Sequence, residues 1–99
     1  MKLLWLPGAI ATLDAQLEYI AQDNPSAAIE QGDRVLEQVE QLLEHPNLGR
    51  PGRVARTREL VIGRTPFIVV YRVRSRARRI ELIRVLHGSQ RWPRSASRT

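Results

Sequence analysis

Apolar residues recur at helical spacing through the first half of the chain. Between Pro7 and Gln22 they are three or four positions apart, and between Pro25 and Glu44 they form an apolar stripe along one side of a helix. Asn24 can cap the second of these segments, and Gly32 in its middle predicts a close crossing of two helices. The apolar positions are Ile10, Leu13, Leu17 and Ile20, followed by Ala28, Val35, Leu36, Val39, Leu42 and Leu43. Two amphipathic helices joined by a short break predict an αα-hairpin.

Shorter apolar runs on either side of these helices predict four strands. Pro and Gly residues punctuate a loop over His45–Arg53, which separates the helices from the last three runs. The runs are Lys2–Leu6, Thr57–Ile62, Phe67–Val73 and Arg79–Leu86. The predicted fold is therefore α+β, in the order β-α-α-β-β-β, with the αα-hairpin packed on one small antiparallel sheet.

Composition limits the possible classes of protein. A chain of 99 residues suits one domain, which we place at residues 1–94, with a frayed tail at 95–99. The chain has no cysteine, only two histidines and no clustered carboxylates, so we expect neither a metal site nor a cofactor. It has no apolar stretch approaching 18 residues and no signal-peptide pattern, so we expect a cytoplasmic protein without membrane contact.

Charge is distributed unevenly along the chain. Sixteen basic residues against ten acidic ones give a net charge of +6, and fifteen of the sixteen are Arg. Nine of the ten acids lie at or before Glu59, and only Glu81 follows. The last third is therefore strongly positive, as expected of a surface that binds a polyanion. A GC-rich genome would also favour Arg over Lys, but it would not cluster the arginines.

Several short motifs occur in a characteristic order across nearly the whole chain. They are W-L-P-x-A at Trp5–Ala9, D-N-P-x-A-A at Asp23–Ala28, H-P-x-L-G-R at His45–Arg50, T-R-E-L at Thr57–Leu60, T-P-F-I-V-V-Y-R-V at Thr65–Val73, I-x-L-I-R-V-L-H at Ile80–His87 and R-W-P at Arg91–Pro93. Each motif is weak alone, but together they resemble the toxins of the RelE/ParE superfamily, the toxic half of type II toxin–antitoxin modules.

The resemblance implies a compact basic toxin neutralised by a small cognate antitoxin that wraps it. RelE-like members enter the ribosomal A site and cleave mRNA, whereas ParE-like members poison DNA gyrase without being nucleases. The superfamily resemblance does not choose between these activities. Our first hypothesis is a toxin that cleaves mRNA on the ribosome without a metal. The alternative is a non-enzymatic gyrase inhibitor, and a third possibility is a relic that only binds antitoxin.

The nuclease hypothesis assigns roles to particular side chains. His87 would act as general acid or base, while Arg91, Arg84 and Arg58 would stabilise the developing phosphorane charge. Glu59 is either a general base or an ion-pair partner for an arginine. Strand alternation points the side chains of Arg58 and Glu59 to opposite faces of the sheet, so only one of them can face the site. The residues expected to contact nucleic acid are Arg50, Arg53, Arg56, Arg72 and Trp92, the last by stacking on a base.

The sequence departs from the nuclease pattern in the strand that begins at Phe67. Nuclease members typically carry basic residues inside this strand, but here none occurs before Arg72. The chain also lacks the lysine-rich loop of RelE, since its one lysine is Lys2. Arginine does not replace lysine as a proton donor or acceptor. These departures favour the gyrase hypothesis.

Overall fold

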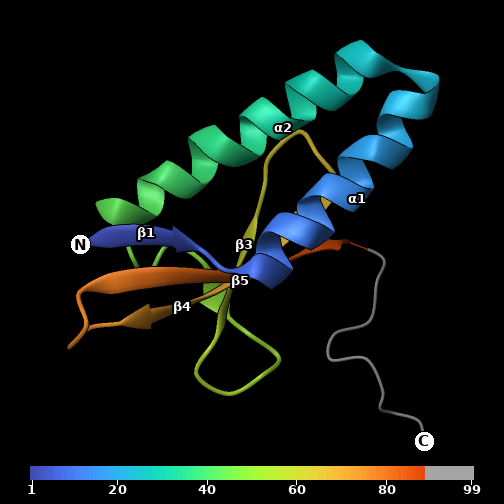
Figure 1. The fold of residues 1–99 in the computed structure, drawn as a ribbon. Helices are drawn as coiled ribbons and strands as arrows, with labels where there is room; N and C mark the ends of the chain where they lie inside the picture. Colours follow the sequence, from blue (N-terminus) through green and yellow to red (C-terminus); the bar gives the residue numbers. More distant parts are fainter. Residues whose placement is uncertain (89–99) are drawn as a thin grey trace, which may run out of the picture.

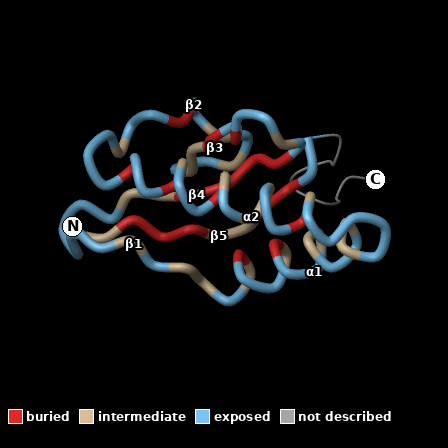
Figure 2. The backbone as a smooth tube through the Cα atoms, turned by 90° about the horizontal axis from the view of Figure 1, so that it is seen from above, coloured by how far each residue is buried: buried red, intermediate tan, exposed pale blue. Residues whose placement is uncertain are grey.

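The computed structural model describes residues 1–88 and confirms the predicted α+β class. The tail and the candidate residues Arg91 and Trp92 lie outside the described residues. The elements are β1 (Lys2–Trp5), α1 (Pro7–Asp23), α2 (Pro25–Glu40), the 3₁₀ helix η1 (Gln41–Leu43), β2 (Arg50–Pro51), β3 (Arg58–Val61), β4 (Phe67–Arg74) and β5 (Arg79–His87). Both α-helices lie over one face of the sheet (Figures 1 and 2).

The strands form one five-stranded sheet in the order β1-β5-β4-β3-β2. β1 runs parallel to β5, with Leu3 opposite Ile80, while the other neighbours are antiparallel. The prediction of a wholly antiparallel sheet was therefore wrong for β1. The αα-hairpin carries the chain from β1 at one edge of the sheet to β2 at the other edge. The antiparallel strands β2 to β5 then return across the sheet, so that β5 lies beside β1 and runs in the same direction. The predicted loop after the helices also contains β2, a two-residue strand at the other sheet edge.

The break between the helices is held by a side-chain cap. The Asn24 Oδ1 accepts a hydrogen bond of 3.1 Å from the backbone N–H of Ala27, and Pro25 occupies the first turn of α2. A Cβ on Gly32 of α2 would lie 3.2 Å from Leu17 Cδ1 of α1, so Gly32 packs close to the end of that side chain. The close helix crossing predicted at Gly32 stays a prediction.

We expect Asn24→Ala to lower the free energy of unfolding by about 1 kcal/mol, the usual cost of losing a side-chain N-cap. Urea denaturation followed by circular dichroism measures the effect. Asn47→Ala is the matched control, because no hydrogen bond of the Asn47 side chain is found in the described part of the chain. Equal losses in the two variants would contradict a specific role for the cap.

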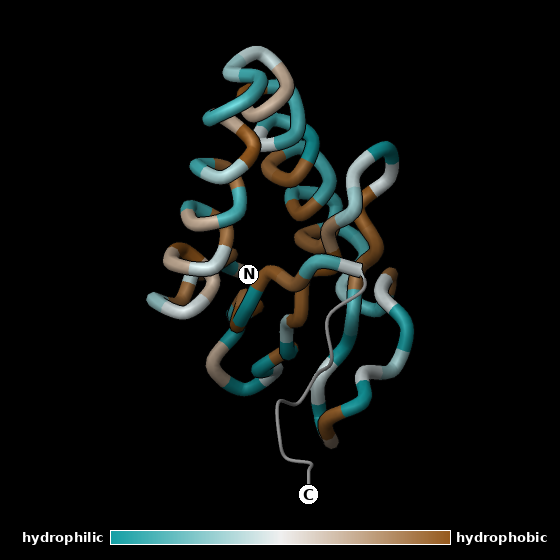
Figure 3. The backbone as a smooth tube through the Cα atoms, turned by 90° about the vertical axis from the view of Figure 1, so that its right-hand side faces the viewer, coloured by the Kyte–Doolittle hydropathy of each residue, from teal (hydrophilic) through white to brown (hydrophobic). Residues whose placement is uncertain are grey.

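The core lies between the hairpin and the sheet, with a smaller apolar cluster on the opposite face. Figure 3 shows hydrophobic stretches along the central strands and at intervals along both helices. Tyr71 and Phe67 are the largest fully buried side chains on the helix side. Ile68, Val70 and Leu86 form the cluster on the other face. A register shift at Val70/Tyr71 changes which residues of β5 point to each side of the sheet, so that apolar side chains of β5 cover both faces.

Candidate functional site

The first of the candidate side chains, Glu59, is buried between two arginines at the β2 edge. Register places Arg50 opposite Glu59, which is 2% exposed. Arg50 Nη2 lies 3.1 Å from Glu59 Oε1. Arg53 donates to Oε2 from its backbone N–H at 3.0 Å and from Nε at 3.2 Å. The ion-pair alternative for Glu59 is therefore observed, and Arg50 and Arg53 are engaged in it.

The charge state of Glu59 follows from these contacts. Burial alone would raise the pKa of the Glu59 carboxyl, but hydrogen bonds from Arg53 and Arg50 outweigh burial and lower the pKa below its usual value. The carboxylate is thus ionised at neutral pH and is stabilised in that form. A general base works best with a pKa near the operating pH, which is the opposite tuning.

A second buried carboxylate repeats the arrangement on β5. Glu81 is 3% exposed, with Arg72 Nε 2.6 Å from Oε1 and Arg79 Nε 2.7 Å from Oε2. The hydrogen bond from Arg72 lowers the pKa of Glu81, burial opposes this, and Arg79 adds to the lowering. Arg72, which we expected to contact nucleic acid, therefore also serves to neutralise a buried acid.

Arg58 and Tyr71 hold the loop that carries the H-P-x-L-G-R motif. Arg58 Nη1 donates to the carbonyl of Gly49 at 2.6 Å. The Tyr71 hydroxyl donates to the carbonyl of Pro46 at 2.7 Å and accepts from the Gly49 N–H at 2.9 Å. A Cβ on Gly49 would lie 2.7 Å from the Tyr71 ring, so the close approach requires glycine. The sequence analysis did not predict this clamp; the glycine of the H-P-x-L-G-R motif was its signal.

The remaining candidates are dispersed over the sheet. His87 is exposed at the end of β5, opposite Phe67, and lines a cleft of about 510 Å³ beside α1. Arg84 lies opposite Val70, whose side chain belongs to the other face. Arg56 sits in the loop before β3 with a φ of 67°, in the left-handed region. Alternation along β5 thus directs His87 and Arg84 to opposite faces of the sheet.

Arg58 is also distant from His87 along the sheet. Arg58 pairs with Tyr71 and His87 pairs with Phe67, four residues apart on β4. At about 3.3 Å per residue, that is roughly 13 Å along the strand.

Among residues 1–88, no three His, Cys, Asp or Glu side chains are grouped to hold a metal ion. No α-helix within that range is long and apolar enough to cross a bilayer.

The two halves of the molecule carry opposite charge. Residues 7–44, the hairpin with its 3₁₀ extension, contain eight acidic residues and one basic residue. Residues 45–88, which form most of the sheet, contain eleven basic residues and two acidic ones. The one basic residue of the hairpin, Arg34, donates to the carbonyl of Arg64 at 3.1 Å. The molecule therefore has an acidic helical side and a basic sheet side.

An αα-hairpin on one face of a five-stranded mixed sheet is the architecture of a RelE/ParE superfamily toxin. Residues 3–92 match the family described as the ParE toxin of the parDE type II toxin–antitoxin system, and the chain belongs to this family. It is a type II toxin of a ParDE-like module.

Two further comparisons agree with this assignment. The chain is 39% identical over 92 residues to the protein named "Putative toxin Y4kP" of Sinorhizobium fredii, and the match covers 93% of each chain. A solved chain of the chromosomal ParDE TA system from P. aeruginosa matches with a TM-score of 0.78 and 30% identity. That match covers 88% of this chain and 95% of the P. aeruginosa chain.

Proposed function

We propose that this toxin arrests growth by binding and inhibiting DNA gyrase, without cleaving RNA, and that a cognate antitoxin neutralises it. The observation that carries the proposal is the dispersal of the described residues assigned to RNA cleavage. His87 and Arg84 lie on opposite faces of the sheet, and Glu59 is enclosed by Arg50 and Arg53. Membership of the ParE toxin family supports the same activity.

The chemistry of RNA cleavage explains why dispersal matters. A general acid or base must lie within about 3 Å of the proton that it transfers, and a cation must reach the same phosphate. The arginine closest in sequence to His87 among the described residues, Arg84, belongs to the other face, and Arg58 is engaged with loop carbonyls. The described arginines are better suited to binding an acidic partner than to catalysis.

The antitoxin is proposed to bind the basic side of the molecule. Residues 45–88 supply the positive potential that attracts an acidic chain, and the sheet edge at β1 offers backbone groups for strand addition. Such a complex should associate faster at low salt, because long-range attraction between opposite charges is screened by ions.

A gyrase assay and a translation assay, run side by side with the purified toxin, test the proposal. We expect wild type and His87→Ala to inhibit gyrase supercoiling equally and to leave cell-free translation intact, because the proposed activity needs no proton transfer. His45→Ala is the matched control, since His45 is the other exposed histidine. The half-inhibitory toxin concentrations should agree within about twofold, a difference well below 1 kcal/mol.

RNA cleavage stays the competing proposal because His87 is an exposed imidazole at the end of β5. Cell-free translation that is blocked by wild type and by His45→Ala, but not by His87→Ala, would favour cleavage. The same translation result would overturn the gyrase proposal if the wild-type toxin also left gyrase supercoiling unaffected. Primer extension on the template mRNA would then map the cleavage positions.

A further inference from the structure

Exposed cations gather at one end of the sheet. β3 begins beside the second half of β4, since Arg58 pairs with Tyr71. β1 and β5 both begin beside the last residue of β4, since Lys2 and Arg74 each pair with Arg79. Figure 1 shows the N-terminus on the same side of the molecule as the turn between β4 and β5. We call this region the basic end and define it by its exposed cations, Lys2, Arg56, Arg74, Arg76 and Arg78.

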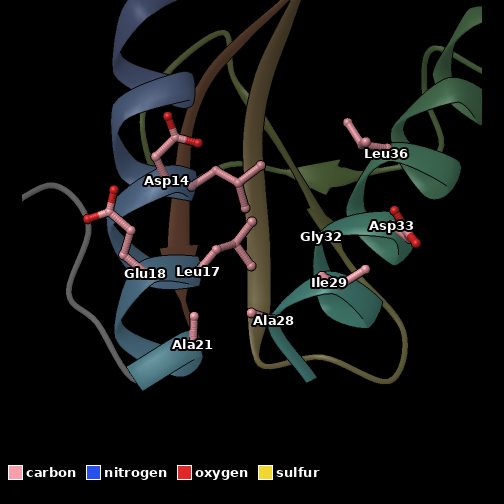
Figure 4. A pocket seen from close by; sticks show the side chains of 10 residues that line it. Asp14, Leu17, Glu18, Ala21, Ala28, Ile29, Gly32, Asp33 and Leu36 are labelled. Atoms are coloured by element: carbon pink, nitrogen blue, oxygen red, sulfur yellow. The ribbon is translucent and has the colours of Figure 1, made fainter. Parts of the chain in front are cut away.

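Two clefts lie at the basic end. Arg56 and Arg58 line one of about 410 Å³, and Lys2 and Arg78 line the other, of about 520 Å³. No Asp or Glu of residues 1–88 lines either cleft. Figure 4 shows three of the exposed acids on the two helices instead, Asp14, Glu18 and Asp33. A polyanion is therefore repelled by the helical side of the molecule and attracted to the basic end.

The arginines of the basic end are not neutralised within the described part of the chain. The two buried acids of the sheet, Glu59 and Glu81, are each enclosed by two other arginines. No ion pair among residues 1–88 includes any of the four arginines of the basic end. Arg56 therefore differs from the other described arginines that we expected to contact nucleic acid, since each of those pairs with a buried acid.

Two of these arginines occupy backbone positions that favour glycine. Arg56 has a φ of 67° and Arg78 a φ of 53°, both in the left-handed region. Each stands in a tight turn, closed by hydrogen bonds of 3.2 Å from the Thr57 N–H to the Val54 carbonyl and of 3.1 Å from the Arg78 N–H to the Ser75 carbonyl. Glycine adopts this conformation without the steric cost of a Cβ. Substitution by glycine therefore removes the charge while suiting the turn, which separates a binding role from a structural one.

The side chains around the arginines indicate the kind of polyanion. In the turn between β4 and β5, only Ser75 and Ala77 separate the arginines before residue 79. No aromatic side chain of residues 1–88 lines either cleft. Aromatic anchors are typical of the centres of protein interfaces, and single-stranded nucleic acid is bound by stacking bases on aromatic rings. Arginines without such rings suit the phosphates of a duplex, which guanidinium groups bind in bidentate fashion.

We propose that the basic end binds the phosphate backbone of duplex DNA. This inference goes beyond the proposed function, because it holds whether or not gyrase is the target. The contact is independent of base sequence, since phosphates carry no sequence information. It brings the toxin to the nucleic acid on which gyrase acts, with the acidic helices facing away from the DNA.

Fluorescence anisotropy of a short labelled DNA duplex, titrated with purified toxin at several salt concentrations, tests the proposal. Arg56→Gly and Arg78→Gly each remove one guanidinium from the basic end. Arg64→Gly is the matched control, because Arg64 is also exposed and has a φ of 65°, but lies in the turn between β3 and β4 at the opposite end of the sheet. The three variants lose the same charge from the same backbone conformation, and thermal circular dichroism checks that each is folded.

We expect Arg56→Gly and Arg78→Gly each to weaken duplex binding by about fivefold or more near 0.1 M salt. Each should also reduce the slope of log affinity against log salt concentration by about 0.9, the value for one lost phosphate contact. Arg64→Gly should stay within about twofold of wild type. Equal weakening by all three variants would overturn the proposal, because net charge alone would then set the affinity.

Three further arms identify the partner. Unchanged duplex binding by Arg56→Gly and Arg78→Gly would overturn the proposal, and weaker antitoxin binding by the same variants would make the antitoxin the occupant. Tighter binding of a single-stranded RNA of the same sequence would overturn the choice of a duplex. A toxin that binds the duplex as expected but leaves gyrase supercoiling unaffected would overturn only the proposed function.

Discussion

Tyr71→Phe is expected to lower the free energy of unfolding by about 3 kcal/mol, although it removes a single oxygen atom. The Tyr71 hydroxyl bonds both the Pro46 carbonyl and the Gly49 N–H, and Gly49 is buried. Without the hydroxyl, both backbone groups lose their partner, and each such loss costs roughly 1–3 kcal/mol. The loop over 45–50 would detach from β4, and with it the register that brings Arg50 to Glu59.

Thermal and urea unfolding of Tyr71→Phe measure this loss. For a chain of this size the midpoint should fall by roughly 12–24 °C. Tyr19→Phe is the matched control, because Tyr19 is largely exposed.

Burial raises the pKa of Tyr71, against the opposing effects of the Gly49 hydrogen bond and Arg58. The tyrosine therefore contributes stability below its unfolded pKa of about 10.0, and this is lost as pH rises through the higher folded value.

Glu59→Gln is expected to lower the free energy of unfolding by about 2 kcal/mol at pH 7. The amide keeps the size of the side chain but loses the charge that Arg50 and Arg53 stabilise. The loss stays below that for a fully buried ion pair, because the two arginine side chains are 54% and 42% exposed and regain water. Glu37→Gln, at an exposed position of α2, is the control.

The pH dependence of this difference follows from the sign of the pKa shift. The pKa of Glu59 is lowered in the folded chain, so its stabilising contribution is complete above the unfolded value of 4.5. It is lost as pH falls through the lower folded pKa, where the wild-type carboxyl also becomes neutral. Urea unfolding from pH 7 to pH 3 should therefore show wild type approaching the variant in acid. A constant difference over this range would contradict the ion-pair explanation.

The order and type of the elements could be read from the sequence because their signals are local. Helical periodicity, the Asn24-Pro25 break and the apolar run from Phe67 predicted the hairpin and the central strand. The direction of β1 could not be read, since no local pattern records whether a strand is parallel to a partner far along the chain. β2 was not predicted, because a two-residue strand that ends in Pro51 has the same sequence pattern as a loop.

The candidate site was less predictable, since its contacts join distant segments. Alternation correctly separated Arg58 from Glu59, but the pairing of Arg50 with Glu59 needed the register between β2 and β3. The opposite facing of His87 and Arg84 depends on strand pairing as well as on their spacing. The exposure of Leu36 could not be foreseen, because this residue fits the same helical pattern whether it faces a core or solvent.

The parallel pairing of β1 with β5 also imposes an order on biosynthesis. Ile80 is made 77 positions after its partner Leu3, so at about 5–20 residues per second β1 waits roughly 4–15 s before its strand partner exists. Until then, β1 has no strand to pair with, and α1 lacks the strand that it packs against. The nascent toxin is therefore unfinished for most of its translation, and antitoxin already present in the cell can meet it as it folds.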